Sequence, residues 1–411
     1  MKKKLLNFLK KNLKKLAHAT IWRYKPLVIA ITGSVGKTSA KEATYAILKD
    51  HYKVRKASGN FNNEIGVPLT ILGEWEEIKG PLFWLKVVFV SLFHLLIKTS
   101  YPEILILEYA ADKPNDIKYL LEIARPKIGI VTAIGEIPSH IEFYADRDAL
   151  VREKTRLVEQ LPVSGYAILN CDDPLVKRME VKTRGKVMTF GFSFGANFRI
   201  TNLENFFEDD KLAGITFKVN YQGNVTPFKI KGVLGRSHAY AAAAASCVGL
   251  ILELNLVQIS ESLFKNYKPA SHRMNLVKGI KDTLIIDDSY NASPLSMREA
   301  IVSLGEIKNH RRIAVLGDML ELGRFAPESH EMIGALAKPN IDFLITIGPR
   351  ARFIIEAALS KGFDKNKIFG FSTVSEAQKF LQSTIRKGDI ILIKASRAMG
   401  LDKIVDNLKA V

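Results

Sequence analysis

Short apolar runs alternate with helix-like stretches along the first half of this chain. The runs are LVIAIT at 27–32, EILILE at 103–108, KIGIVTAI at 127–134 and AILN at 167–170, and the stretch 146–161 has the composition of a helix. Short strands that alternate with helices are typical of a mostly parallel sheet with helices on both faces. We therefore predict an α/β domain here.

The pattern changes twice further along. Glycines interrupt alternating Phe, Ile and Val between 186 and 233, which predicts an antiparallel appendage of strands. An alanine-rich helix at 238–253 follows, and we interpret NYKPASHRM at 266–274 as an inter-domain link and candidate hinge. Further apolar runs with helices between them predict a second, Rossmann-like α/β domain. These runs are TLIIDD (283–288), RIAVLGDM (312–319), DFLITIG (342–348), KIFGF (367–371) and DIILIKAS (389–396).

The composition is that of a globular protein. Apolar residues make up 47% of the 411 residues and charged residues 25%, which excludes disorder along the whole chain and a coiled-coil rod. Two cysteines, Cys171 and Cys247, are too few for a disulfide framework and indicate a reducing compartment. We therefore expect a cytoplasmic location.

The net charge of +18 is concentrated at the start of the chain. Residues 1–25 contain nine Lys or Arg and no Asp or Glu. The mild surplus elsewhere suits anionic substrates and not a nucleic acid. Leucines recur at threes and fours among these lysines, which predicts a basic amphipathic helix. Such a leader either packs its leucines on its own domain or lies on anionic lipid.

A second unusual stretch, PLFWLKVVFVSLFHLLI at 81–97, is almost wholly apolar. It is too short to span a membrane and contains Lys86 and His94. It is either a helix that covers the core or a shallow element that acts with the leader at the inner face of the membrane.

The strongest local signal is TGSVGKTS at 32–39, which follows a predicted strand and opens a predicted helix. In a phosphate-binding loop the small residues let backbone N–H groups approach phosphate oxygens, and the helix N-terminus adds a favourable potential. A lysine here would neutralise phosphate, and a hydroxyl after it would bind Mg²⁺. We therefore expect a nucleotide to contact Gly33, Ser34, Val35, Gly36, Lys37, Thr38 and Ser39.

Two further residues end predicted strands. Glu108 closes EILILE, where a carboxylate at the sheet edge beside the loop would bind Mg²⁺. His140, in GEIPSHIEF, is a candidate second metal ligand. No Asn-Lys-x-Asp motif for reading guanine occurs, so we expect the nucleotide to be ATP.

These residues belong to a longer set of motifs that resembles the Mur ligases, in their MurF branch. The matching segments run in family order from residue 27 to the end of the chain, and they are TGSVGKTSAKE (32–42), GNFNNEIGVPLTIL (59–72), SHIEF (139–143), AILNCDDP (167–174), IIDDSYNASPLSM (285–297), AVLGDMLELG (314–323) and ILIKASRAMGL (391–401). The resemblance implies a P-loop-type ATPase domain at 26–268, which contains the 81–97 insertion, and a Mur ligase C-terminal domain at 269–411. The basic leader at 1–25 precedes them.

The resemblance also implies roles for individual residues. Lys37 and Thr38 match the loop lysine and the metal-binding hydroxyl, and Glu108 and His140 match metal-site residues. Lys154 falls where many members carry a carbamoylated lysine that supports a second Mg²⁺. Other matches are Asn60, Asn62 and Asn63 in the substrate cleft, Arg273, Asp288 and Asn291 near ATP, and Lys394, Ser396 and Arg397 near the incoming amino substrate.

The implied activity is ATP-dependent amide synthesis with two Mg²⁺ ions. A carboxylate of an anionic cell-wall precursor becomes an acyl phosphate, and an amino acid or a dipeptide, D-Ala-D-Ala in this branch, displaces phosphate. Two alternatives remain open: a ligase for another acceptor, similar to folylpolyglutamate synthase or cyanophycin synthetase, and a non-catalytic ATP-binding regulator at the membrane.

The sequence departs from the family pattern in three places, and the mildest is the replacement of a usual glycine in EYAADKPNDI (108–117). Only the basic leader of about 25 residues precedes the ATPase domain, where Mur ligases usually have a domain that binds the UDP-sugar. Around GRSHAYAAAAA (235–245), alanine stands where family members direct an asparagine at adenine. We therefore expect other groups to hold the adenine.

Overall fold

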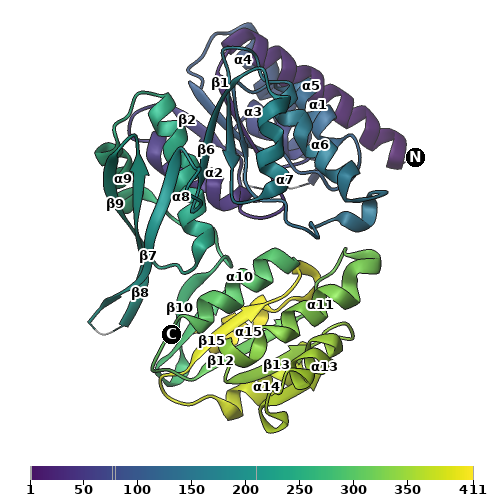
Figure 1. Ribbon diagram of the computed structural model, residues 1–411. Coiled ribbons are helices and arrows are strands. Elements are labelled where there is room, and N and C mark those ends of the chain that lie inside the picture. Colours follow the sequence, from purple (N-terminus) through teal and green to yellow (C-terminus); the bar gives the residue numbers. More distant parts are fainter. Residues whose placement is uncertain (1, 76, 79, 210, 411) are drawn as a thin grey trace.

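The computed structural model describes residues 2–75, 77–78, 80–209 and 211–410, and it contains two sheets joined by one link (Figure 1). In these residues nine strands form the first sheet, in the order β2-β3-β1-β4-β5-β6-β7-β8-β9. Their bounds are β1 Leu27–Thr32, β2 Val54–Lys56, β3 Ile104–Glu108, β4 Ile128–Val131, β5 Tyr166–Asn170, β6 Lys186–Gly191, β7 Phe198–Glu208, β8 Lys211–Tyr221 and β9 Asn224–Lys231.

The sheet is parallel from β2 to β7 and antiparallel from β7 to β9. The antiparallel appendage predicted for 186–233 is therefore confirmed for β7, β8 and β9 but not for β6. A crossover through α7 (Pro174–Lys177) separates β5 from β6, which allows the two strands to run in the same direction. The appended strands continue the main sheet.

Helices cover both faces of this sheet. Alternate residues of β1 point to opposite sides, so Ile29 and Ile31 join one core cluster while Val28 and Ala30 join the other. Both sets are fully or almost fully buried, which explains the continuous apolar run. The helices are α1 Lys2–Tyr24, α2 Lys37–Leu48, α3 Gly66–Leu72, α4 Gly80–Leu96, α5 Asp116–Ile123, α6 Arg147–Glu159, α8 Arg236–Ile251 and α9 Leu256–Asn266.

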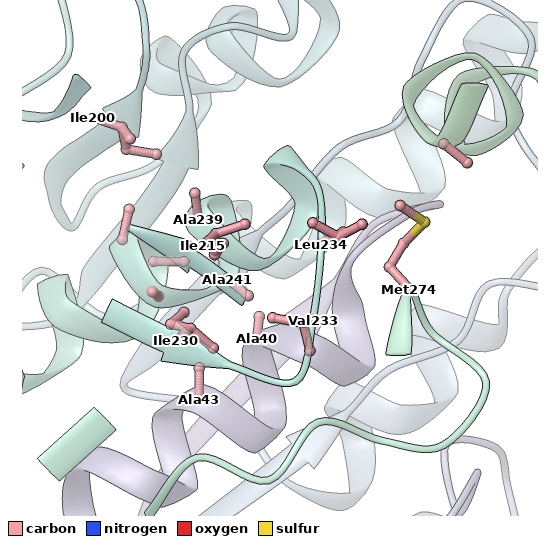
Figure 2. Close-up of a cluster of buried hydrophobic side chains, with 14 of the residues drawn as sticks. Ala40, Ala43, Ile200, Ile215, Ile230, Val233, Leu234, Ala239, Ala241 and Met274 are labelled. Carbon is pink, nitrogen blue, oxygen red and sulfur yellow. The ribbon is translucent and has the colours of Figure 1, made fainter. Parts of the chain in front are cut away.

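Small side chains let α2 and α8 pack closely. Figure 2 shows Ala40 and Ala43 of α2 near Ala239 and Ala241 of α8, in the cluster that also holds Ile215 and other residues of the sheet. All four alanines are at most 3% exposed. Because α2 begins at the end of the phosphate loop, this packing fixes the helix end on which the candidate site depends.

The second sheet has the order β10-β11-β15-β12-β13-β14 in the described residues and is parallel except for β10. Its strands are β10 Asn275–Gly279, β11 Thr283–Asp287, β12 Arg312–Gly317, β13 Phe343–Ile347, β14 Ile368–Phe371 and β15 Ile390–Lys394. Its helices are α10 Pro294–Gly305, α11 Ala326–Ala335, α12 Ala337–Asn340, α13 Arg352–Ser360, α14 Val374–Thr384 and α15 Asp402–Leu408. The second α/β fold is therefore confirmed.

Residues 267–274 connect the sheets without regular secondary structure. The link is held at its end, where the Leu234 N–H donates to the Met274 carbonyl at 3.0 Å and Val233 bridges to Asn275.

The basic leader is the helix α1, and it packs on its own domain. Leu13 and Ala17 are at most 1% exposed and belong to the second core cluster. Lys10 and Lys14 form ion pairs with Glu64 and Glu122. Among the residues that the structure describes, no helix has the length and apolar character needed to cross a bilayer.

Candidate active site

A cavity of about 470 Å³ lies between the two domains and gathers most of the predicted site residues. Those that line it are Ser34, Val35, Gly36, Lys37, Thr38, Ser39, Asn60, Asn62, Asn63, Glu108, His140, Arg273, Asp288, Asn291, Lys394, Ser396 and Arg397. Gly33 and Lys154 do not line it. Gly33 belongs to the loop itself, and Lys154 lies directly behind it, where its Nζ donates to the Gly33 carbonyl at 3.0 Å.

The phosphate loop needs its two glycines for different reasons. A Cβ on Gly33 would lie 2.1 Å from Thr132 Oγ1, so no other residue fits against the end of β4. Gly36 has φ of 89°, a left-handed conformation that favours glycine, and it turns the chain into α2 at Lys37. The Ser34 hydroxyl lines the cavity and has no hydrogen-bond partner within the described residues. A phosphate oxygen is the acceptor that this orphaned donor suits.

Glu108 ends β3 and lies opposite Ile31 of β1, beside the loop. It is 3% exposed, and its carboxylate accepts from Thr38 Oγ1 at 3.1 Å and from Asn62 Nδ2 at 3.2 Å. Burial alone would raise the pKa of Glu108, but the charges of Lys41 and Lys37 outweigh burial and hold it below its ordinary value. A charged carboxylate next to a hydroxyl is a donor set that Mg²⁺ prefers.

Two lysines converge on one backbone oxygen of the loop. Lys37 Nζ donates to the Gly33 carbonyl at 2.8 Å, and Lys154 Nζ reaches the same oxygen from α6. Lys154 is 1% exposed. Burial and the charge of Lys37 lower the pKa of Lys154 to about 7.

His140 lies at the junction of the two domains. Its Nδ1 is 2.6 Å from Glu321 Oε2, in the loop after β12, and its Nε2 is 3.5 Å from Asp112 Oδ1. Burial lowers the pKa of His140, against the attraction of Asp112. Sequence reasoning missed both acidic residues. Glu321 lies within AVLGDMLELG (314–323), which matches a family segment, and Asp112 lies within EYAADKPNDI (108–117), where the chain departs from the family pattern.

The second domain contributes a basic wall. The Arg273 and Arg397 guanidiniums lie 4.2 and 4.9 Å from the centre of the Tyr290 ring. The amine of Lys394 already has protein partners, because its Nζ lies 2.5 Å from Asp288 Oδ2 and donates to the Asn291 carbonyl at 2.9 Å. Arg397 is exposed and is therefore the more accessible cation.

Ser396 and Asn63 use their side chains for hydrogen bonds within the protein. Ser396 Oγ accepts from the Leu320 N–H at 2.8 Å and so holds the loop after β12. Asn63 Oδ1 accepts from the N–H groups of Ile65 and Gly66 at 3.1 and 3.0 Å, at the start of α3. The structure thus gives both residues a structural contact at the edge of the cavity.

A second cavity of about 410 Å³ shares Val35, Gly36, Ser237 and Glu299 with the first. Phe190, Tyr240 and Leu295 give it apolar walls, and the Tyr240 hydroxyl donates to Asp172 Oδ2 at 2.8 Å. Ala241, from the alanine-rich segment, also lines it. A cavity with aromatic and apolar walls beside a phosphate loop fits a nucleoside.

Comparisons with known proteins agree with this geometry. Residues 31–79 and 89–249 match the Mur ligase middle domain, and residues 272–397 match the Mur ligase, glutamate ligase domain. The UDP-N-acetylmuramoyl-tripeptide–D-alanyl-D-alanine ligase of Bacillus subtilis is 31% identical over 407 residues, with 96% of this chain and 79% of that protein covered.

Solved structures show the same fold. The MurF ligase of Thermotoga maritima in complex with ADP superposes with a TM-score of 0.79 and 26% identity, over 97% of this chain and 82% of that one. The folylpolyglutamate synthase of Mycobacterium tuberculosis superposes with a TM-score of 0.66 at 14% identity, over 95% of each chain, and shares the fold alone. Two domain matches along the chain and a relative at this identity place the chain in the Mur ligase family.

Proposed function

We propose that this chain is an ATP-dependent ligase that joins D-alanyl-D-alanine to the peptide of a UDP-linked muramoyl tripeptide, in the cytoplasm, during peptidoglycan synthesis. The relatives at about 30% identity carry this activity in their names. The observation that carries the proposal is the first inter-domain cavity, in which a phosphate loop, a buried carboxylate and a basic wall face one another.

The reaction proceeds in two steps. A carboxylate oxygen of the acceptor attacks the γ-phosphorus of ATP, and the bond to the ADP oxygen breaks. The amine of the dipeptide then attacks the acyl carbon of the acyl phosphate, loses a proton and expels phosphate, which leaves an amide. Both steps concentrate negative charge, so their transition states need fixed cations and N–H donors in a water-poor site.

The residues of this chain meet that need. Lys37 and the loop N–H groups hold the phosphates from the first domain, and Arg273 faces them from the second. Thr38 and Glu108 would hold a Mg²⁺ ion, which supplies positive charge to the phosphate oxygens when bound. His140 is a further candidate ligand. Asn60 and Asn62 line the same cavity, where their amides can contact the acceptor.

Lys154 supports the proposal of a second ion. A buried amine with a pKa of about 7 is about half neutral at pH 7, and the neutral form is a nucleophile for CO₂. Addition of CO₂ to the neutral amine forms an N–C bond and releases one proton, which leaves an anionic carbamate. Starting from the protonated amine, a second proton is lost first, so a buried cation becomes a buried anion. Such an anion behind the loop would favour a second Mg²⁺.

In this proposal the amine substrate and the adenosine of ATP bind at separate sites. The exposed guanidinium of Arg397 offers a partner for the carboxylate of the incoming dipeptide, and Lys394 and Ser396 fix the segment that carries it. The second cavity takes the adenosine, with Tyr240 and Leu295 against the base. This arrangement replaces the asparagine that the family directs at adenine. The link at 267–274 would be the hinge on which the second domain closes.

The test is phosphate release from ATP with the purified full chain. We expect release to require both a UDP-linked muramoyl tripeptide and D-Ala-D-Ala, with the amide product identified by mass. Lys37→Ala should lower the rate by on the order of 100- to 1000-fold, whereas Lys49→Ala, at the far end of the same helix, should not change it.

The alternatives give other results. Stimulation by a folate and glutamate, with no response to the muramoyl tripeptide, would assign the folylpolyglutamate synthase reaction. Tight ATP binding without phosphate release in the presence of any amine would show that the chain is the non-catalytic ATP-binding regulator.

A further inference from the structure

The helix α4 is apolar on two opposite sides, and only one of them is covered. Phe83, Val87 and Ser91 point into the domain and are at most 9% exposed. The side chains on the opposite stripe are 43–81% exposed and recur at threes and fours along the helix. We name this stripe the α4 outer face, and it consists of Leu82, Leu85, Phe89, Leu92, Phe93 and Leu96.

Such a face is unusual on a surface helix. A helix that packs on a globular core normally presents charged and polar residues to water on its other side. A contiguous group of large exposed apolar side chains marks an interaction site. The first half of α4 also lies outside the matched family ranges, which stop at 79 and resume at 89. Leu82 and Leu85 of the α4 outer face therefore lie in a segment that the family model does not match.

The neighbouring helix α1 presents a related surface. The two helices touch where Arg23 Nη2 donates to the Leu96 carbonyl at 3.4 Å and the Tyr24 hydroxyl donates to the His94 carbonyl at 2.7 Å. Opposite its buried side, α1 exposes Phe8 and Trp22, at 66% and 74%, with Lys11 and Lys15 between them. We name these four residues the α1 outer face.

The charges carried by the two helices themselves have one sign. Residues 1–25 contain no Asp or Glu, and neither do residues 80–102, which contain Lys86 and Lys98. The exposed acidic residues Glu74 and Glu77 precede the N-terminal end of α4. Lys25 and Lys98 are exposed close to the other end of α4, where α1 meets it.

We propose that the α1 and α4 outer faces dock together on an anionic lipid bilayer, with both helices lying in the plane of its surface. Apolar side chains enter the acyl boundary, Trp22 lies at the headgroup level, and the lysines contact anionic headgroups. A two-fold dimer through the same surface would instead place the basic residues of one copy against those of the other. The one-signed charge therefore favours lipid over a second copy.

The docked orientation leaves the ligase machinery free. In Figure 1 the helices α1 and α4 lie at the top of the first domain, and the second domain lies at the opposite end of the molecule. The second domain therefore faces away from the bilayer and closes over the cavity without contact with lipid. Docking is independent of the proposed reaction, and either can fail without the other.

The experiment is flotation of the full chain with vesicles of phosphatidylcholine alone or with 30% phosphatidylglycerol. We expect partitioning to be at least tenfold stronger on the anionic vesicles and to fall as salt is added. Leu85→Glu with Phe89→Glu should lower it at least tenfold. Val163→Glu with Val181→Glu, which places the same charges at positions 72% and 84% exposed away from both helices, should leave it unchanged. Lys11→Glu with Lys15→Glu should remove the preference for anionic lipid.

Thermal unfolding and phosphate release in solution, measured on every variant, confirm that the fold and the reaction are intact. Equal partitioning of the wild type and the Leu85/Phe89 variant would overturn the proposal. So would an equal loss in the Val163/Val181 variant. A third outcome would assign the α4 outer face to a second copy of the chain. In that case neither protein would bind vesicles, and light scattering would show a dimer for the wild type and a monomer for the Leu85/Phe89 variant.

Discussion

Lys37 and Lys154 donate to the same oxygen, the Gly33 carbonyl, at 2.8 and 3.0 Å. The two amines come from α2 and α6, so the phosphate loop is gripped from the cavity side and from behind. Burial disfavours the charged form of Lys154, and the nearby charge of Lys37 repels it. Together they lower the pKa of Lys154 to about 7. At neutral pH about half of Lys154 is therefore uncharged, behind a loop that binds anions.

The first prediction is that Lys154 is carbamoylated. Protein equilibrated with carbon-13-labelled bicarbonate at pH 8 should give one carbamate carbon signal, because the buried amine is then mostly neutral. Lys154→Arg keeps the cation but cannot form the carbamate, so the signal should be absent and phosphate release should fall. Removal of CO₂ should slow the wild type only. An unchanged carbon spectrum in the arginine variant would refute the assignment.

The second prediction concerns stability and pH in CO₂-free buffer. The pKa of Lys154 is lowered to about 7 in the folded protein from 10.5. Between these values the unfolded chain binds the proton that the folded chain has lost, so the free energy of unfolding rises with pH across this window. The contribution of Lys154 has a slope of about 1 kcal/mol per pH unit. Urea unfolding at pH 7.5, 8.5 and 9.5 should therefore show a shallower rise for Lys154→Met than for the wild type.

The third prediction separates two adjacent asparagines. Asn62 orients the Glu108 carboxylate, whereas Asn63 holds the start of α3. Asn62→Ala should raise the Mg²⁺ concentration needed for phosphate release by about 10-fold or more, with little effect on unfolding. Asn63→Ala should cost about 1 kcal/mol of stability and leave the Mg²⁺ dependence unchanged. The reverse pattern would show that the roles are exchanged.

The fourth prediction concerns the contact between the domains at His140. Glu321→Ala removes the carboxylate 2.6 Å from His140 Nδ1 and should loosen closure of the second domain. X-ray scattering should then give a larger radius of gyration, and the apparent KM for ATP should rise. Glu142→Ala is the control, since Glu142 meets Glu321 only through its backbone N–H, at 3.3 Å. Equal scattering curves for the wild type and Glu321→Ala would contradict this role.

Local pattern was enough to predict the strands and the loop. β1 occupies the predicted 27–32, and Glu108 ends β3 as expected, because buried parallel strands need continuous apolar runs. The direction of β6 was not predictable, since glycine-interrupted alternation suits either direction and the crossover through α7 decides it. The contacts Lys154–Gly33 and His140–Glu321 join residues far apart in sequence, and only the order of the strands brings them together.

The last prediction tests where the adenosine binds. Leu295 lines the second cavity and lies close to Gly135, in the loop after β4 of the first domain. A Cβ added to Gly135 would lie 3.3 Å from the Leu295 side chain. Leu295→Trp fills that cavity without changing a charge or the phosphate loop. We expect it to weaken ATP binding by about 10-fold or more, while inorganic tripolyphosphate, which lacks the base, competes as well as before. Leu359→Trp, at a side chain 41% exposed on α13, is the matched control. Equal weakening of ATP and tripolyphosphate would mean that the tryptophan disturbs the loop itself, and unchanged ATP binding would place the adenosine outside this cavity.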